Sequence, residues 1–449
     1  MLVRFFAVLS LCGYALGQNA ALVAAPMPQP IPFPQQPAQT SAPLTLTFQD
    51  ALTRARAVVP DFITAKTDAA IAKEDRVQAR AALLPAVNYN NSAIYTEPRN
   101  NPFGFVFVAN NSVHEYISQG NAHEDIGVDA IYAYRQARAA EAIARAKYEI
   151  ALRGLVVTVA EAYYGLVVAQ RKYSTAQLAM QEAQRFLTIS QQLESGGEVA
   201  HADVIKAQIQ FNDRNRLLQE AQLALDKARL GLAVLVFQDF NQNFTVVDDL
   251  ALSPPLPPIN EVQAAATRNN PDLMAALAGV TLAQAAVTSA RAGYLPSLAL
   301  DYWYGIDAPQ FAIYNQDHVR NLGYAMAATL NIPIWNWGAT QSKVRQANLR
   351  EQQARVQLSA AQRQLLANIQ NAYREAEVAR TERDLLRQSF DLASDSLRLT
   401  NLRYQGGDAT VLEVVDAQNT LSQARDAYDD GEARYKIALA NLQTLTGTP

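Results

Sequence analysis

The chain has 449 residues with 38 basic and 42 acidic side chains, and its formal net charge of −4 gives no electrostatic reason to expect a nucleic-acid partner. Four histidines and one cysteine leave few ligands for a metal and few nucleophiles, and no disulfide can form within the chain. The sequence also has no Gly-rich phosphate loop with lysine, no nucleophile elbow and no paired-histidine zinc helix. We therefore expect no metal, no cofactor and no enzymatic activity.

Residues 1–17 are predicted to form a secretory signal peptide, because Arg4 is followed by an apolar run and then by Ala15-Leu16-Gly17. Cleavage there would remove Cys12, whose lipidation we disfavour because a large residue precedes it. Residues 18–43 are a Pro-rich leader that we expect to be extended. Beyond the signal, no uninterrupted apolar stretch approaches the roughly 18 to 20 residues of a membrane-spanning helix. Any membrane passage is therefore expected to use strands.

The rest of the chain is an internal duplication. Residues 48–90 align with residues 259–301 at an offset of 211, and ten of the 43 aligned pairs are identical, where chance would give about three. We predict a first structural repeat over residues 44–252, a Pro-rich linker over 253–258 and a second repeat over 259–449. Each repeat is expected to contain a short helix, a second helix, a pair of strands and two long helices.

Each predicted strand pair follows a proline and shows a period of two. In the first repeat, residues 87–96 alternate, and Ile126, Val128, Ala130 and Tyr132 predict the partner strand; in the second repeat, residues 298–306 and 322–334 alternate. The windows 86–134 and 294–337 hold 17 of the 37 aromatic residues and all three tryptophans. This concentration favours aromatic girdles at two water–lipid boundaries over a sheet in water.

The long helices carry the signature of a coiled coil. Residues 134–194 contain no proline, so a continuous helix there would be roughly 90 Å long. In the helix that follows, apolar residues recur every seven positions from Val204 to Leu232, and the seam is interrupted only by Arg214. The second repeat follows the same rule from Val414 to Leu442. A strict heptad repeat of apolar residues predicts knobs-into-holes packing along a supercoiled seam. The fold class is therefore mainly α with a small β part.

Four strands per chain cannot close a membrane barrel, because open edges inside lipid would leave backbone amides unpaired. The chain must therefore oligomerise to insert. Two copies would give eight strands and a filled interior, whereas three would give twelve strands and a lumen. Long helices continuous with these strands would extend the cylinder away from the membrane.

The duplicated pattern resembles the TolC family of outer-membrane efflux proteins. The resemblance rests on Leu-Pro at 84/85 and 295/296, on the segments 331–335 and 403–407, and on residues 413–418, and it covers about residues 45–446. It implies a homotrimer with a twelve-stranded β-barrel in outer-membrane lipid and an α-helical barrel in the periplasm. It also implies a periplasmic adaptor protein, an inner-membrane pump, and passive export of small molecules or polypeptides.

Two glycine pairs, Gly196-Gly197 and Gly406-Gly407, interrupt the helical pattern and are predicted to be the turns of two helical hairpins. The resemblance implies that these tips contact the adaptor and that the adjoining helix turns constrict the pore. Carried over by position, the predicted aperture residues are Asp203, Tyr404, Glu413 and Asp416. Some family members have an arginine at the position of Ala409, so a bridge from that position to the first hairpin is not expected here.

Glu413 and Asp416 are three residues apart and so share one helical face. Three copies would place six carboxylates around a narrow aperture, where mutual repulsion should raise some of their pKa values and favour cations. The alternative is that both are ordinary exposed acids near a helix start, where the helix dipole favours them.

Several polar residues remain with weaker interpretations. His114, His123-Glu124-Asp125 and His318 are predicted to lie in loops outside the barrel, where solvated side chains are favoured over a metal site, and His201 is predicted to be a surface residue beside the first tip. The acidic pairs Asp248-Asp249 and Asp429-Asp430 are not expected to form catalytic dyads. The competing functional class is a periplasmic coiled-coil adaptor or scaffold, which would share the long helices but not the aromatic strand pairs.

Overall fold

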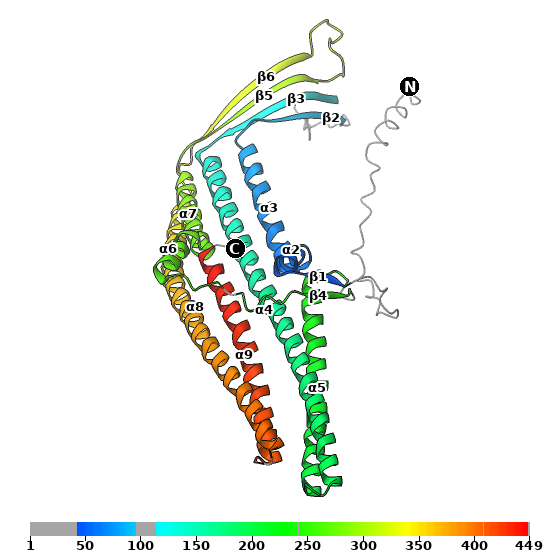
Figure 1. The fold of residues 1–449 in the computed structure, drawn as a ribbon. Coiled ribbons are helices and arrows are strands. Elements are labelled where there is room, and N and C mark those ends of the chain that lie inside the picture. The colour runs from blue at the N-terminus through cyan, green and yellow to red at the C-terminus, as the bar shows by residue number, and fades with distance from the viewer. Residues whose placement is uncertain (1–42, 96–113, 240–241, 253, 407, 448–449) are drawn as a thin grey trace, which may run out of the picture.

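The computed structural model describes residues 43–95, 114–239, 242–252, 254–406 and 408–447 and shows a long helical body that ends in a sheet (Figure 1). The predicted signal peptide, with Cys12, lies outside the described residues, and so does the predicted leader except for its last residue. The described part is elongated, with the sheet at one end and two helical hairpins at the other (Figure 1).

Both halves contain the predicted succession of elements. The first half comprises α2 (Phe48–Val58), α3 (Pro60–Ala81), β2 (Ala86–Tyr95), β3 (His114–Ile126), α4 (Val128–Ser195) and α5 (His201–Val236). The second comprises α6 (Ile259–Asn269), α7 (Pro271–Ala292), β5 (Ser297–Ala308), β6 (Leu322–Asn331), α8 (Ala339–Gln405) and α9 (Val411–Thr446). Two short strands that were not predicted, β1 (Leu44–Leu46) and β4 (Phe244–Val246), pair in parallel beside α2 and α4.

Local sequence signals explain where several helices begin. Pro60 opens α3, as predicted, and Pro271 opens α7; both lie in the first turn, where the missing N–H of proline is not needed. Thr47 caps α2, and Thr47 and Asp50 form a capping box. Gly338 precedes α8 with a left-handed φ of 82°, a conformation that glycine adopts without steric cost.

The partner strand predicted through Ile126, Val128, Ala130 and Tyr132 is wrong, because α4 begins at Val128 and the strand is His114–Ile126. Gly127 separates the two elements, and the apolar residues beyond it also fit a helical period, an ambiguity that is inherent in short apolar runs. The prediction that His114 and His123 lie in loops is also wrong, because both residues belong to the strand His114–Ile126. β6 likewise ends at Asn331 and not at residue 334.

The main sheet has the order β2-β3-β5-β6, and each neighbouring pair is antiparallel. Next to it α3, α4, α7 and α8 pack side by side in the same order (Figure 1). Farther from the sheet, α4 and α5 form one hairpin, α8 and α9 form the other, and α9 packs on α4. The chain is therefore a single curved wall with two open edges.

The largest buried cluster lies about halfway along this wall, where α2, α4, α5 and the β1–β4 pair meet. At its centre the Tyr163 hydroxyl donates to the carbonyl oxygen of Val247 at 2.8 Å and lies 3.1 Å from the carbonyl oxygen of Leu46. Phe48 packs against Tyr163 and Tyr164, with ring centroids 5.8 Å apart in both pairs. These contacts attach the small sheet firmly to α4.

Two helical segments, Val128–Ser195 and Ile259–Ala292, each contain an 18-residue window apolar enough to cross a membrane, with mean hydropathy of 1.4 and 1.6. The expectation that no helix beyond the signal peptide could span a membrane was based only on uninterrupted apolar runs, and these two windows are interrupted by polar residues. Both segments belong to the packed wall, since α4 contacts α5, α7 and α9, and α7 contacts α4 and α8. A helix with an apolar packing face meets the same criterion without spanning a bilayer.

Candidate functional site

The main sheet has one face that is mainly apolar and one that is mainly polar. Residues paired across the strands share a face, so one row joins Tyr89, Gly120, Tyr304 and Tyr324, and the next joins Val87, Ala122, Tyr302 and Met326. The large side chains of these rows are exposed in the single chain, by 78% for Val87 and 73% for Tyr324. The opposite face carries the rows Asn88-Asn121-Trp303-Ala325 and Asn90-Gln119-Gly305-Gly323. Such a sheet is suited to lipid on one side and water on the other.

His123 lies on the polar face of β3. Its Nδ1 is 2.7 Å from Asp301 Oδ1 on β5, and its Nε2 is 3.2 Å from Asp125 Oδ2. The two carboxylates lie at different ring nitrogens and so do not converge on one point. In the described ranges no group of three or more His, Cys, Asp or Glu side chains could hold a metal ion. His318 lies between β5 and β6, where it has a left-handed φ of 59°.

The first hairpin tip is closed by backbone hydrogen bonds. The N–H groups of Gly196, Gly197 and Glu198 donate to the carbonyls of Gln192, Glu194 and Leu193 at distances of 3.1, 2.9 and 2.9 Å. Gly197 has a φ of 76°, a left-handed conformation that favours glycine. The predicted turn therefore lies where the sequence placed it. His201 follows it as an exposed residue whose Nδ1 is 2.6 Å from Glu194 Oε1.

The second tip has the same form. The Gly406 N–H donates to the Leu402 carbonyl at 3.1 Å, and the Asp408 N–H donates to the Arg403 carbonyl at 2.9 Å. Gly407, the other predicted tip residue, lies outside the described residues. α9 then begins behind a capping box: the Thr410 N–H donates to Glu413 Oε1 at 3.1 Å, and the Glu413 N–H donates to the Thr410 hydroxyl at 3.4 Å.

The structure gives Glu413 a role within its own chain. Besides Thr410, the carboxylate faces Arg403, with Nη1 and Oε2 3.3 Å apart. Hydrogen bonds from the backbone and hydroxyl of Thr410, and then the charge of Arg403, hold the pKa of Glu413 below its ordinary value. Within one chain the pKa shift is thus opposite to the one that repulsion in a carboxylate ring would produce. The sequence contained this signal, since Thr410-x-x-Glu413 has the spacing of a capping box.

The other predicted aperture residues have different environments. Asp416 is exposed and has no hydrogen-bond or ion-pair partner among the residues that the structure describes, whereas Asp203 Oδ1 accepts from Lys206 Nζ at 3.2 Å. Tyr404 packs on Phe186 of the other hairpin, with ring centroids 5.5 Å apart. The two rings belong to an apolar tip cluster that also contains Leu187, Val204, Ala207, Phe211, Val411, Val414 and Val415. Tyr404 therefore joins the hairpins by packing.

Arg214, the interruption of the α5 seam, has a structural role that sequence reasoning missed. It is only 6% exposed, and its guanidinium donates to the Asn419 side chain at 2.5 Å and to the Ser422 hydroxyl at 3.4 Å, both on α9. Burial lowers the pKa of Arg214, although Asp213, Glu182 and Asp426 oppose this effect. The charge in an apolar heptad was a visible signal, but its partners, more than 200 residues away along the chain, were not.

A second polar cluster holds the wall together at mid-height. Arg171 on α4 binds Asp248 through Nε and Nη2, at 2.5 and 2.8 Å, and donates through Nη1 to Asp429 at 2.9 Å and Glu432 at 2.7 Å. Burial opposes the charge of Arg171, but the bonds to these carboxylates outweigh it and raise its pKa. The acidic pairs seen in the sequence are thus partners of basic residues, since Asp430 also pairs with Lys172 at 2.8 Å.

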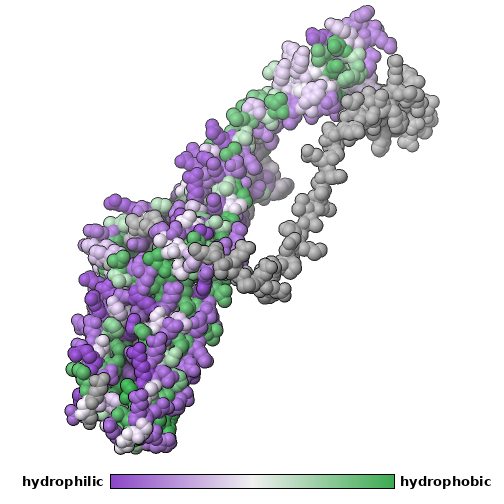
Figure 2. All heavy atoms as spheres, turned by 45° about the vertical axis from the view of Figure 1, so that its right-hand side comes forward, coloured by the Kyte–Doolittle hydropathy of each residue, from purple (hydrophilic) through white to green (hydrophobic). Residues whose placement is uncertain are grey.

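Large apolar side chains remain uncovered along both open edges of the wall. On α8, Val378, Leu385, Leu392 and Leu399 recur every seven residues and are 52–72% exposed. The other edge exposes Ile63, Ile71 and Val77 on α3 and Ile209, Leu223 and Leu230 on α5. Hydrophobic residues also run along the lower helices between polar ones in Figure 2. A heptad stripe without a partner indicates an interface that one chain leaves incomplete.

A helical wall that continues into a sheet with one apolar and one polar face defines a channel-forming protein of the bacterial outer membrane. A sequence model of the family "Outer membrane efflux protein" matches residues 51–236 and 263–448. The chain belongs to this family, and the two matched segments reflect its duplication. It is therefore an outer-membrane protein with its helical part in the periplasm, as predicted, and the family match decides against the adaptor alternative.

The chain is similar to relatives of known role. It is 25% identical over 394 residues to outer membrane protein TolC of Vibrio cholerae, covering 86% of each chain. It is 24% identical over 310 residues to TolC of Escherichia coli K12, a match that covers 67% of this chain and 63% of that protein. The fold is similar to the Campylobacter jejuni CmeC outer membrane channel, with a TM-score of 0.74, 18% identity, and 89% and 85% of the two chains covered.

Proposed function

We propose that three copies of the chain form a passive exit duct that carries small molecules or polypeptides across the outer membrane. The observation that carries this proposal is the four-stranded sheet, which has an apolar and a polar face and is open at both edges. Each unpaired backbone group in lipid costs several kcal/mol, so β2 and β6 need partners. Because β2 and β6 run in opposite directions, β6 of one copy can pair antiparallel with β2 of the next.

The helical edges support the same assembly. α8 lies on the side of β6, whereas α3 and α5 lie on the opposite side of the wall, so the neighbour whose β2 pairs with β6 also brings its α3 and α5 toward α8 (Figure 1). The exposed α8 heptad would then be covered by the apolar residues of that neighbour. Two copies would give a barrel of eight strands that side chains fill, whereas three give twelve strands and an open interior.

The hairpin tips are the proposed periplasmic entrance. The glycine turns at residues 196–197 and 406–407 would contact a periplasmic adaptor, which links the duct to an inner-membrane pump that supplies the energy. Asp203, Tyr404, Glu413 and Asp416 would form the aperture. Since Glu413 already serves the start of α9 and Asp416 has no partner within the described chain, Asp416 is the carboxylate free to act on permeating cations.

Purification from outer membranes in detergent tests the assembly. We expect a particle of three chain masses that conducts ions in a planar bilayer, and a stable water-soluble monomer that never inserts would refute the proposal. Leu385→Lys with Leu392→Lys should abolish the trimer by placing charges in the α8 stripe. Asp384→Lys with Asp391→Lys, at exposed positions with the same spacing but about 100° around that helix from the stripe, is the matched control and should leave the trimer intact.

Single-channel recording tests the aperture. Glu413→Ala with Asp416→Ala should reduce the preference for cations over anions, and most of the change should already appear in Asp416→Ala alone. Asp391→Ala with Asp395→Ala, a pair of exposed acids about three to four helical turns above the tip, should leave the preference unchanged. An unaltered preference in the first double variant would remove the aperture role from both residues.

A further inference from the structure

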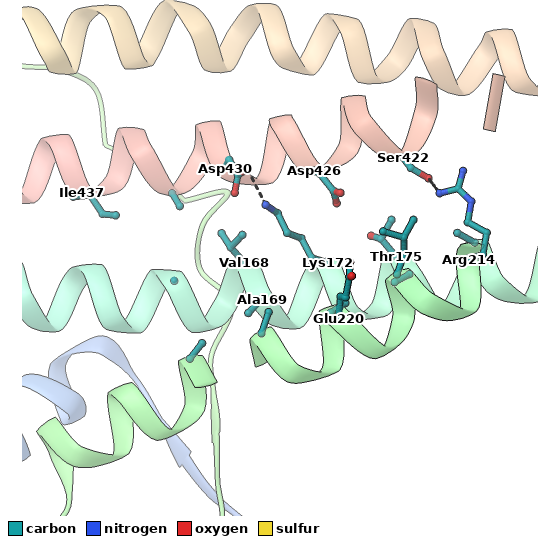
Figure 3. A pocket seen from close by; sticks show the side chains of 18 residues that line it. Val168, Ala169, Lys172, Thr175, Arg214, Glu220, Ser422, Asp426, Asp430 and Ile437 are labelled. Atoms are coloured by element: carbon teal, nitrogen blue, oxygen red, sulfur yellow. Dashed lines mark hydrogen bonds and ion pairs between the residues drawn. The ribbon is translucent and has the colours of Figure 1, made fainter. Parts of the chain in front are cut away.

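A hollow of about 620 Å³ lies between α4, α5 and α9, and it extends from the level of the Arg171 cluster toward the tips (Figure 3). Small side chains leave the space between the three helices unfilled there, and the walls include Ala169, Ala176, Ala179, Ala221 and Ala224. Val168, Leu217 and Ile437 add larger apolar surface. The hollow is open to solvent at its rim, because the side chains of Glu220 and Asp430 are 60% and 58% exposed. Its size suits a drug-sized molecule.

Most charged groups around the hollow already have partners. Lys172 Nζ is 2.8 Å from Asp430, Glu220 is 2.7 Å from Arg216, and Arg214 is held by Asn419 and Ser422. The exception is Asp426, which projects from α9 toward α4 and α5 in Figure 3. Its Oδ1 is buried and has no hydrogen-bond partner among the described residues. Burial raises the pKa of Asp426 more strongly than Lys172 lowers it, which is the effect expected of an uncompensated carboxylate.

We propose that this hollow binds an amphipathic monocation, with an ammonium group at the Asp426 carboxylate and an apolar body against the alanine walls. A carboxylate with a buried oxygen that lacks a donor is costly, and it gains most from a positively charged donor that is attached to an apolar group. A single free carboxylate selects one positive charge. An anion is disfavoured because the lining contains three acids against two bases, and both bases are engaged. The site lies within one chain and does not depend on the proposed trimer or its transport.

Calorimetry on the full chain in a non-ionic detergent tests this site with two probes of the same shape. We expect 1-naphthylmethylammonium to bind saturably, and the neutral 1-naphthylmethanol to bind at least tenfold more weakly. Asp426→Asn, which keeps the side-chain shape, should remove that preference by weakening only the ammonium. Ala224→Leu should weaken both probes by filling the hollow. Asp391→Asn, an exposed acid on α8, is the control and should change nothing.

The outcomes separate the parts of the proposal. Absence of saturable ammonium binding to the wild-type chain overturns it. Equal ammonium affinity in the wild-type chain and Asp426→Asn overturns the role of the carboxylate, and tighter binding of 1-naphthoate than of the ammonium overturns the choice of a cation. Asp426→Asn removes an unpaired charge and should fold, and an unchanged particle mass and melting temperature would establish that. Loss of conductance without loss of binding would refute only the proposed duct.

Discussion

The Arg171 cluster gives the sharpest test of what holds the wall together. Arg171→Met removes the guanidinium but keeps an apolar stem of similar length. It leaves Asp429 and Glu432, whose side chains are 6% and 5% exposed, without their cation. Breaking a buried ion pair by removing one partner costs about 3–5 kcal/mol, because the remaining charge stays in a poorly solvated place. Asp248 is 42% exposed, so its lost pair adds at most about 1 kcal/mol.

A matched control isolates the contribution of burial. Arg434 also contacts two carboxylates, Glu375 and Glu382, but all three side chains are 42–49% exposed. Arg434→Met should therefore cost no more than about 1 kcal/mol. Unfolding of the detergent-solubilised protein by urea, followed by circular dichroism, compares the two variants. If Arg171→Met and Arg434→Met lower the free energy of unfolding equally, burial of the carboxylates does not explain the loss of stability in Arg171→Met.

A rescue experiment tests the mechanism further. Adding Asp429→Asn and Glu432→Gln to Arg171→Met removes the uncompensated charges while keeping the side-chain shapes. Most of the lost stability should return, because neutral amides are cheaper to bury than carboxylates. A triple variant that is as unstable as Arg171→Met would show that the loss of stability comes mainly from the lost hydrogen bonds and not from the unpaired carboxylates.

Three further predictions concern the hairpin ends. Gly197→Ala, at a φ of 76°, should destabilise the first tip by about 1 kcal/mol, whereas Gly196→Ala, at a φ of −80°, should cost less; hydrogen exchange at the start of α5 distinguishes them. Thr410→Ala should weaken the start of α9 by about 1 kcal/mol, and unchanged amide exchange there would contradict the capping role. Hydrogen bonds from Thr410 and then the charge of Arg403 lower the pKa of Glu413. The stabilisation that ionised Glu413 gives to the start of α9 is therefore complete above the ordinary carboxyl pKa, and it is lost as pH falls through the lowered pKa. Exchange protection of α9 should therefore match at pH 7 and pH 5 and fall only below about pH 4, and earlier loss would refute this assignment.

The sequence was informative where one periodic signal dominates. The duplication and the heptads from Val204 and Val414 predicted the hairpins, because a coiled-coil seam is written into the chain at fixed spacing. β3 was missed because one face of that strand is polar except for Ile117 and includes Gln119, Asn121 and His123, so the strand has little overall hydrophobicity. A strand between lipid and water hides half of its signal in this way.

The candidate site was predictable only in part, for a different physical reason. The positions of the glycine turns follow from local backbone requirements, and the structure agrees at Gly196, Gly197 and Gly406. The partners of Arg171 and Arg214 lie between 77 and 261 residues away along the chain, and no local pattern pairs them. Charges in such positions can be recognised from sequence as unusual. Which polar groups each one meets is decided by how α9 and the segment around Asp248 pack against α4 and α5.

The distribution of contacts along the wall bears on how an aperture can change without unfolding the chain. At mid-height, aromatic packing around Tyr163 and the buried charges around Arg171 join α4, α9 and the small sheet. Toward the tips, the described residues of the two hairpins share a small apolar cluster around Phe186 and Tyr404, and the hydrogen bonds of Gln210 and Arg214 to Asn419 are the next connection up the wall. Segments with few buried contacts open at lower free energy than a core does. We therefore expect movement of the tips to end near Arg214, below a mid-height cluster that stays closed.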